Sequence, residues 1–469
     1  MVTPINRIPP EILSLIPDFW YACERDQNLI ALTHVCRTWR EVFISRPSLW
    51  TNLDCEDEEK ACVYLKRSKT SPINLSLYRA DRLFPHDPFF DIIPQASDRL
   101  VSLIIEGAPE NIQDITSRLC RPSPLLEELT IASMKKRGLR NPVIAPVLLN
   151  GDLSSLRELS LESVRTELPW RNMINLTSFT LIYPSPGEIS VRQFLDFFES
   201  APRLRNVDLY SVILTPSDQN RRLVTLACLK EMEIRDCGPS SALLDHLLIP
   251  VGAVLITRAD LVTSLIGDLL PRSLDNLRNF SNFTAIKLSV DESKPCMEFS
   301  GPNGRVRITP TNSRADGTRL VLGSLAQFDT SKTEKLVIEK GNLQSGDPLY
   351  RALLPMKDLC ALTLSKCKSL YIFIHALRPS TSSSKIMACP KLEELVLIFH
   401  PDSKAVGIKN VIGMAAARAS RGKKLRAIRI VDSRDEIDPG DVLELKKHVL
   451  RVEHCPGIVG STVNNDEED

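Results

Sequence analysis

The sequence predicts an α/β chain in which a small helical segment precedes a long repeat array with a parallel sheet. Two observations support this. An apolar stripe at Leu29, Leu32, Cys36, Trp39 and Phe43 alternates steps of three and four, which predicts one helix face. From about residue 100 an apolar phrase recurs at intervals typical of repeat proteins. The predicted parts are a helical domain (1–52), a linker and capping region (53–98), the array (99–455) and a disordered acidic tail (456–469).

The helical domain opens with prolines at positions 9 and 10, and proline suits the first turn of a helix. Pro17 should end this helix near Ile16, and the polar residues 24–28 predict a turn into the next helix. The apolar face is too large for about fifty residues to bury alone. We therefore expect this domain to dock onto a partner or a neighbouring domain.

The repeat phrase is an apolar residue followed by two more at positions +3 and +5. The clearest copies are Leu100-Leu103-Ile105, Leu126-Leu129-Ile131, Leu156-Leu159-Leu161, Leu176-Phe179-Leu181, Leu204-Val207-Leu209, Leu229-Met232-Ile234, Leu359-Leu362-Leu364, Leu392-Leu395-Leu397 and Leu425-Ile428-Ile430. Weaker copies are Val251-Val254-Ile256 and Phe283-Ile286-Leu288. The last two apolar positions of each copy are two apart, so both point inward from a short strand. Copies stack because each covers the apolar flank of the previous one.

Two details refine this prediction. Cys237 and Cys367 follow their strands where a small inward residue is needed, which predicts a structural role. Residues 289–333 fit the phrase poorly, and Gly301-Pro302-Asn303-Gly304 predicts a turn between two strands, a local β insertion or a distorted repeat. The alternative is a non-repetitive α/β domain rich in leucine.

The N-terminal residues resemble the F-box family. The blocks that carry the resemblance are Ile8-Pro9-Pro10-Glu11-Ile12-Leu13, Val35-Cys36-Arg37-Thr38-Trp39-Arg40 and Pro47-Ser48-Leu49-Trp50, with an apolar helix between the first two. Ile8 stands where the family has Leu, and Pro17 where it commonly has Phe. Residues 16–20 also resemble F-box proteins of mushroom-forming fungi. The recurring phrase resembles the leucine-rich repeat, which many F-box proteins carry for recognition.

The resemblance implies a substrate adaptor of an SCF-type (Skp–cullin–F-box) ubiquitin ligase. The expected partners are a Skp-family linker protein with its cullin complex, and an unknown target protein. The residues expected to bind the linker are Ile8, Pro9, Ile12, Leu13, Ile16, Leu32, Val35 and Trp39. The alternative for part of this stripe, Trp39 especially, is the core of the helical domain itself. Such an adaptor is not an enzyme and needs no cofactor or metal.

Composition agrees with that expectation. Lys and Arg number 59 against 58 Asp and Glu, without the basic stripe of a nucleic-acid-binding protein. No apolar run is long enough for a membrane span, and no secretory signal is recognisable. The twelve cysteines lack zinc-ligand spacing, and no nucleotide-binding or catalytic motif occurs. We expect an intracellular protein of the cytoplasm or nucleus.

Residues that alternate with the buried pairs should line the concave face of the array, where a target would bind. The expected target-binding residues are Glu128, Glu158, Ser160, Asp208, Tyr210, Glu231 and Glu233. The alternative is a solvated strand face that binds no ligand. This surface is acidic early in the array and turns basic late, at Arg429. Two alternatives are a repeat scaffold whose F-box is vestigial or non-degradative, and a small-molecule receptor with its pocket in the array.

Overall fold

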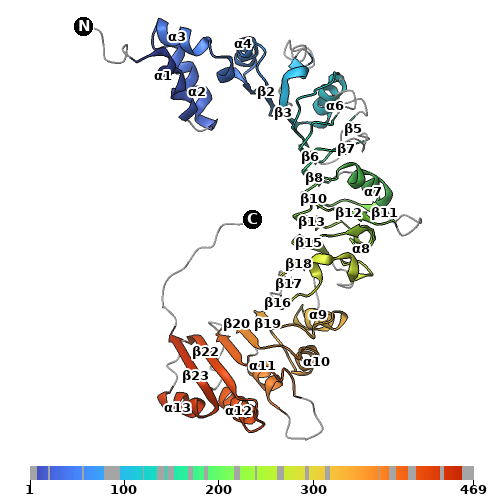
Figure 1. Cartoon of the computed structure of the whole chain (residues 1–469), viewed down its shortest axis with the longest axis vertical. Helices are drawn as coiled ribbons and strands as arrows, with labels where there is room; N and C mark the ends of the chain where they lie inside the picture. The colour runs from blue at the N-terminus through green and yellow to red at the C-terminus, as the bar shows by residue number, and fades with distance from the viewer. Residues whose placement is uncertain are drawn as a thin grey trace. The chain divides into compact units, whose positions relative to one another are not determined.

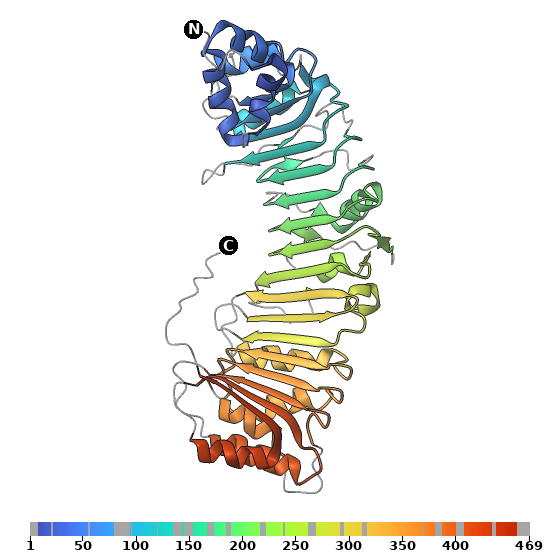
Figure 2. The same cartoon turned by 60° about the vertical axis from the view of Figure 1, so that its left-hand side comes forward.

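The computed structural model describes residues 8–19, 22–54, 57–78, 94, 96–119, 121–134, 143–144, 153–166, 173–183, 189–215, 222–237, 240–260, 269–290, 295–311, 317–368, 370–379, 387–399, 408–433 and 438–456. The chain forms two compact units, Met1–Ser217 (unit 1) and Asp218–Asp469 (unit 2). Both combine helices with mostly parallel strands (Figures 1 and 2). The predicted α/β class with a parallel sheet is therefore confirmed. The expected tail beyond Pro456 lies outside the described residues.

The elements of unit 1, with η for 3₁₀ turns, are α1 (Pro10–Leu15), η2 (Ile16–Phe19), α2 (Ala22–Thr33), α3 (Arg37–Ile44), η3 (Pro47–Trp50), β1 (Asn52–Asp54), α4 (Glu58–Ser68), β2 (Ile73–Leu77), η5 (Ser97–Arg99), β3 (Leu100–Gly107), α6 (Pro109–Arg118), β4 (Glu128–Ser133), β5 (Val143–Ile144), β6 (Glu158–Glu162), β7 (Arg165–Thr166), β8 (Ser178–Ile182), β9 (Ile189–Ser190), α7 (Val191–Ser200), β10 (Asn206–Tyr210) and β11 (Leu214–Thr215).

The N-terminal helices differ from the prediction in one respect. The first helix does end before Ile16, as Pro17 predicts. The stripe from Leu29 to Phe43, however, is divided between α2 and α3, because Cys36 takes an extended conformation and begins α3. Residues 24–28 lie within α2, so the turn predicted there is wrong. The turn comes ten residues later, where the carbonyl of Thr33 accepts a hydrogen bond from Arg40 Nε at 2.9 Å.

The main sheet of unit 1 is parallel throughout the described residues, in the order β1-β2-β3-β4-β6-β8-β10. From β4 to β10 the strands are in register, so that Leu129, Leu159, Phe179 and Val207 form one row. These side chains are at most 3% exposed. The inward-pointing pairs of the phrase are thus the core of this unit, as predicted.

The elements of unit 2 are β12 (Val224–Thr225), β13 (Glu231–Arg235), α8 (Ser241–Leu244), β14 (Leu247–Leu248), β15 (Val254–Asp260), η8 (Leu274–Asn276), η9 (Arg278–Phe280), β16 (Ala285–Val290), β17 (Pro295–Gly301), β18 (Gly304–Thr311), α9 (Gly317–Ser324), η10 (Leu325–Gln327), β19 (Lys335–Glu339), α10 (Asp347–Leu353), β20 (Ala361–Ser365), α11 (Leu370–Leu377), β21 (Glu394–Ile398), α12 (Ile408–Ala419), β22 (Leu425–Ser433), α13 (Pro439–His448) and β23 (Val449–Pro456).

The sheet of unit 2 runs β13-β15-β18-β17-β16-β19-β20-β21-β22-β23, and only β17 is antiparallel to its neighbours. The predicted turn joins β17 to β18, which confirms a β insertion. Gly304 has a φ of 128°, and a Cβ there would lie 2.5 Å from the carbonyl oxygen of Ala253, so only glycine fits. The helices of this unit lie on one side of the sheet (Figure 2), and we name the other side its open face.

The sequence analysis was wrong about two copies of the phrase: one was placed out of register, and one was missed. In β15 the buried residues are Leu255 and Thr257, whereas Val254 and Ile256 are half-exposed, so that copy was placed one residue out of register. In β19 the pair Leu336 and Ile338 is buried but was not recognised as a copy. Thr333, which is fully buried, stands there in place of the first leucine.

Candidate protein-binding surfaces

The N-terminal helices have a small core of their own. Trp39 and Phe43 of α3 are buried, and their rings meet edge to face with centroids 5.9 Å apart. Leu13 of α1 and Leu29 of α2 are also buried, at 2% and 0% exposure. Each of the three helices therefore contributes to the core that fixes their packing.

Trp50 connects these helices to the rest of unit 1. Its Nε1 donates a hydrogen bond to the carbonyl of Phe43 at 3.0 Å, and its ring packs edge to face against Tyr64 of α4 at 4.9 Å. The guanidinium of Arg67 lies 4.3 Å from the centre of the same ring. Because the Trp50 side chain is fully buried in these contacts, removing it would expose α4 as well as α3.

The residues expected to bind a linker protein divide into three groups by exposure. Pro9, Ile12 and Val35 are exposed, Ile8, Ile16 and Leu32 are half-buried, and Leu13 and Trp39 are buried. The exposed fractions of Ile12 and Val35 are 56% and 54%. Only the first two groups can contact a partner without unfolding of the segment, whereas Leu13 and Trp39 pack in its core.

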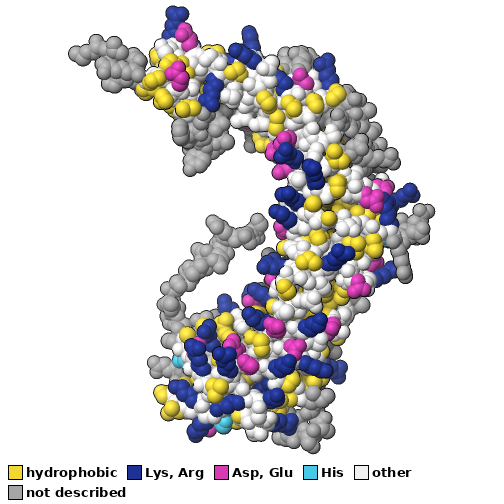
Figure 3. All heavy atoms as spheres, in the orientation of Figure 1, with side chains coloured by type: hydrophobic (Ala, Val, Ile, Leu, Met, Phe, Trp, Pro, Cys, Tyr) yellow, Lys and Arg dark blue, Asp and Glu magenta, His cyan; other side chains and the backbone are white. Residues whose placement is uncertain are grey.

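Two further apolar residues of these helices are exposed that sequence reasoning did not select. Leu15 is 44% exposed and Ile30 is 37% exposed. Leu15 lies three residues after Ile12, on the same helix surface, and this spacing was a usable signal. Figure 3 shows apolar side chains on the visible surface of the N-terminal helices, among charged ones.

The face of the unit 1 sheet that carries Glu128 and Glu158, which we name the open face of unit 1, is polar. Glu128 of β4 pairs in register with Glu158 of β6, and Thr130 with Ser160. Adjacent strands lie about 4.8 Å apart, so the two carboxylates are neighbours. Both are exposed, and neither forms an ion pair within the described residues. Like charges on facing positions cost stability, so this is an electrostatically unfavourable arrangement that a basic ligand would relieve.

The same face carries the other expected residues of unit 1, one row further along the strands. Ser160 is in register with Thr180 of β8 and then with Asp208 of β10, and Tyr210 ends that strand. Asp208 and Tyr210 are half-buried. The structure thus brings Glu128, Glu158, Ser160, Asp208 and Tyr210 onto one sheet face.

Two hollows lie on the open face of unit 1. The first, of about 290 Å³, is lined by Glu128 and by polar residues of β1 to β3, among them Asn74, whose amide donates to Asn52 Oδ1 at 2.9 Å. The second, of about 560 Å³, lies at the ends of β3, β4 and β6 and is lined by Glu106, Glu162 and Tyr183, among others. Both hollows therefore include carboxylates.

Tyr183 adds an aromatic wall to the second hollow. It follows β8 with a φ of 48°, and its ring lies 4.7 Å from that of Tyr210. The same left-handed backbone recurs directly after other strands, at Ser163, Ser211, Asp236, Lys340 and Lys366, so it belongs to the turn of the repeat. Sequence reasoning identified Tyr210 but missed Tyr183, because it lies in the turn just beyond the strand and outside the alternation.

The open face of unit 2 carries several ion pairs. Glu298 of β17 contacts Arg307 at 2.7 Å and Arg305 at 3.5 Å. Other pairs are Glu233–Arg235 at 2.7 Å, Lys287–Glu339 at 3.1 Å and Arg429–Glu453 at 2.7 Å. Glu231 is exposed on β13. Glu231 and Glu233 belong to this second unit. Arg429, expected to make the late surface basic, shares the carboxylate of Glu453 with Arg451, so two arginines lie against one glutamate there.

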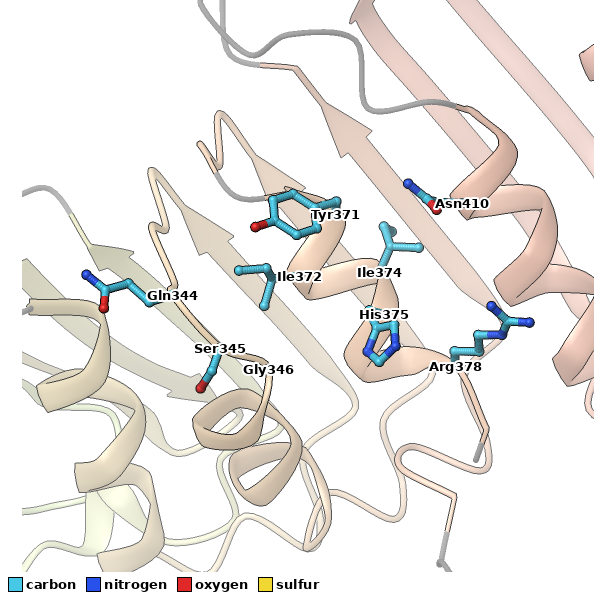
Figure 4. A pocket seen from close by; sticks show the side chains of 9 residues that line it. All are labelled: Gln344, Ser345, Gly346, Tyr371, Ile372, Ile374, His375, Arg378 and Asn410. Atoms are coloured by element: carbon cyan, nitrogen blue, oxygen red, sulfur yellow. The ribbon is translucent and has the colours of Figure 1, made fainter. Parts of the chain in front are cut away.

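A hollow of about 270 Å³ lies on the helical side of unit 2, over α11. Figure 4 shows Gln344 and Arg378 at opposite ends of it, with the residues of α11 between them. Tyr371 and His375 are exposed on that helix. These polar groups are spread along the hollow and do not converge on one point, so we assign it no ligand.

Three of the described cysteines, Cys237, Cys367 and Cys389, are buried. Cys237 and Cys367 are each 1% exposed, and the thiol of Cys237 lies 3.1 Å from the carbonyl of Arg235. Burial raises the pKa of Cys367 and of Cys389 to about 12, which keeps both thiols protonated. Within the described residues no group of three or more His, Cys, Asp or Glu side chains is placed to hold a metal ion, and no helix is both long and apolar enough to cross a membrane.

Comparison with known proteins gives no assignment: no protein-family model and no curated protein matches this chain. The function must therefore be argued from the two surfaces above.

Proposed function

We propose that this protein is the substrate-recognition adaptor of an SCF-type ubiquitin ligase. Its helices α1 to α3 act as an F-box that docks a Skp-family linker, and the strands of both units form a degenerate leucine-rich-repeat solenoid. The open face of unit 1 holds the target protein. The adaptor does no bond chemistry and acts by raising the local concentration of the target at the ubiquitin donor.

The observation that carries the proposal is the exposure of apolar residues on a segment that is otherwise packed. Ile12, Leu15, Ile30 and Val35 remain exposed, although the helices have their own core and are fixed to α4 through Trp50. A few apolar side chains on a rigid helical surface are what helix-mediated docking uses. The four sequence blocks of the F-box resemblance fall on the same segment.

Docking is tested with surface variants that leave the core intact. Ile12→Glu combined with Val35→Glu should abolish co-purification of a Skp-family linker protein with the full chain. The matched control is Val63→Glu on α4, which is 42% exposed and lies outside the helices α1 to α3. Leu13→Ala is unsuitable, because Leu13 is buried and the change would open a cavity. Unchanged linker binding by the folded double variant would refute the docking assignment.

The target surface is tested separately. Glu128→Lys with Glu158→Lys should eliminate recovery of the target while linker binding persists, since charge complementarity sets specificity and association rate. Asp98→Lys with Glu110→Lys changes the same number of exposed charges elsewhere in unit 1 and serves as the control. Affinity purification with the proteasome blocked identifies the target. Recovery of the same proteins by the Glu128 and Glu158 variant would exclude this face.

The docking variant also separates the adaptor from a scaffold with a vestigial F-box. An adaptor loses linker and cullin but keeps its target, and the target then accumulates in cells. A scaffold shows no linker to lose. Deleting residues 1–50 would be a poorer test, because it would remove Trp50 and expose Tyr64.

A further inference from the structure

The larger hollow on the open face of unit 1, of about 560 Å³, has walls of different chemistry. Its lining includes two carboxylates, an aromatic ring, a thioether and a small apolar side chain, which belong to Glu106, Glu162, Tyr183, Met134 and Ala132. The strands that carry the carboxylates follow one another along the sheet (Figure 1), and Glu106, Ala132 and Glu162 occupy one register row. The side chain of Ala132 therefore lies between the two carboxylates.

The two carboxylates lie on either side of a gap. Adjacent strands are about 4.8 Å apart, so the backbones at Glu106 and Glu162 are separated by about 10 Å. Ala132 fills little of the space between them. Glu106 is half-buried and Glu162 is exposed, and in the part of the chain that the structure describes neither forms an ion pair or a side-chain hydrogen bond. A single cation placed in the gap would contact both carboxylates.

The aromatic wall is a property of Tyr183 and not of the turn in which it lies. The same turn holds Ser163 and Ser211, with φ of 52° and 53°, so it needs no aromatic ring. The N–H of Tyr183 donates to the carbonyl of Tyr210 at 2.9 Å, and the two rings lie 4.7 Å apart. These contacts hold the ring beside the hollow before a ligand arrives, which lowers the cost of binding.

The three kinds of wall together fit the side chain of arginine. A guanidinium group is planar and has five N–H donors, so it can bond carboxylates on two sides and stack on an aromatic ring. Its methylene stem packs on apolar surface, which Met134 provides at 46% exposure. The ammonium of lysine is more strongly hydrated and has no plane to stack. The aromatic wall therefore favours arginine over lysine.

We propose that this hollow binds one arginine side chain of the target protein, with the guanidinium between Glu106 and Glu162 and against the ring of Tyr183. The assignment rests on the proposed target-binding role of the open face of unit 1, and it names the residue that the target presents there. Glu128 and Glu158 lie four residues earlier in their strands, about 13 Å away, and contact other residues of the target.

The test uses the full chain and short peptides, so the target need not be known. The probe is N-acetyl-Ala-Arg-Ala-amide, whose affinity is measured by saturation-transfer NMR at about 0.15 M salt. Two matched peptides carry citrulline, which has a similar shape without the charge, or lysine. The wild type should bind the arginine peptide about 10-fold or more tightly than the citrulline peptide, because the charge-assisted hydrogen bonds are lost. It should also bind the arginine peptide more tightly than the lysine peptide.

Variants of the hollow should weaken binding of the arginine peptide. Glu106→Gln with Glu162→Gln keeps the shape of both side chains and should lower the affinity about 10-fold or more. Tyr183→Ser should lower it about 3-fold, as expected for loss of a cation–π contact at an exposed site. The fold tolerates this change, because serine occupies the same turn at Ser163 and Ser211.

The matched control is Glu128→Gln with Glu158→Gln. It removes two charges from the same face, but these charges lie beyond the screening length of about 8 Å from the hollow, so the peptide affinity should not change. No preference for arginine over citrulline would overturn the proposal, and so would an affinity that the Glu106 and Glu162 variant retains. Equal binding of the lysine peptide would overturn the choice of arginine.

A competing occupant is the chain's own basic segment Lys135-Lys136-Arg137, which follows Met134 directly. Changing these three residues to Gln should leave peptide affinity unchanged, whereas tighter binding by that variant would overturn the proposal in favour of this segment. Target recovery separates the hollow from the proposed function. If Glu128→Lys with Glu158→Lys loses the target and Glu106→Gln with Glu162→Gln keeps it, the face binds the target but the hollow does not hold its arginine.

Discussion

The open faces of the two units are built from the same kind of parallel strands but treat their charges differently. In unit 1, Glu128 and Glu158 are exposed neighbours without an ion pair in the part of the chain that the structure describes. In unit 2, Glu298 is only 15% exposed and contacts two arginines. Ion pairs on a sheet face stabilise that sheet. Neighbouring like charges without ion pairs repel each other, and a ligand of opposite charge would relieve this repulsion. The comparison therefore favours unit 1 as the surface for a basic target.

The hydrophobic cores of the two units should respond alike to substitution. Truncating a core leucine in either unit is the largest effect that we predict. Leu159→Ala in unit 1 and Leu362→Ala in unit 2 should each lower the free energy of unfolding by about 2–5 kcal/mol, because each opens a cavity in a packed core. Both side chains are 2% exposed. Urea unfolding followed by circular dichroism measures the loss. A loss in only one unit would mean that the two sheets are not built on equivalent cores.

The paired face should respond to removal of its central carboxylate. Glu298→Ala should destabilise unit 2 by about 1.5–3 kcal/mol, because Arg307 loses a charged hydrogen-bond partner. Hydrogen bonding to Glu298 raises the pKa of Arg307, which agrees with a stabilising contact. Urea midpoints of the variant and of Glu298→Gln measure the effect. If both variants were as stable as the wild type, the ion pairs of Glu298 would not stabilise unit 2, and the difference between the two open faces would lose its basis.

Unit 2 should also carry a pH dependence of its own. Cys367 and Cys389 stay protonated in the folded state up to about pH 12, whereas unfolded thiols ionise near pH 9. Between these values the unfolded state binds fewer protons, so stability is fully present below pH 9 and falls as pH rises toward 12. Cys367→Ala with Cys389→Ala should flatten this fall relative to the wild type in urea titrations. Parallel profiles would show that the two thiols are not buried as described.

The smallest effect should come from the unpaired face itself. Glu158→Gln removes one of two neighbouring like charges and should change stability by no more than about 0.5 kcal/mol, in the stabilising direction. Its effect should shrink as salt is added, because exposed charges are screened. Thermal unfolding at low and high ionic strength measures both. A clear destabilisation would mean that Glu158 has a structural partner, and the face would lose its priority as a binding surface.

The sequence by itself determined the class of the chain and most of its core. Leu159, Leu161, Leu362 and Leu364 are buried on parallel strands because a period of two in a strand leaves one apolar face to cover. The inserted hairpin was also predictable, since Gly304 needs a backbone that other residues avoid. These features depend on residues close together in the chain, namely the alternation of apolar residues in a strand and the glycine in a turn, so a single sequence is enough to predict them.

What depends on contacts between distant residues was decided only by the tertiary structure. Leu13 and Trp39 were expected at an interface but pack inside, and Tyr183 joins Glu106 only because β3 and β8 share a sheet. Arg418 is fully buried and donates to the carbonyls of Leu377, Ala388 and Cys389, which no sequence pattern announces. Burial and charge pairing arise from neighbours far apart in the chain, so periodicity shows which face is apolar but not what covers it.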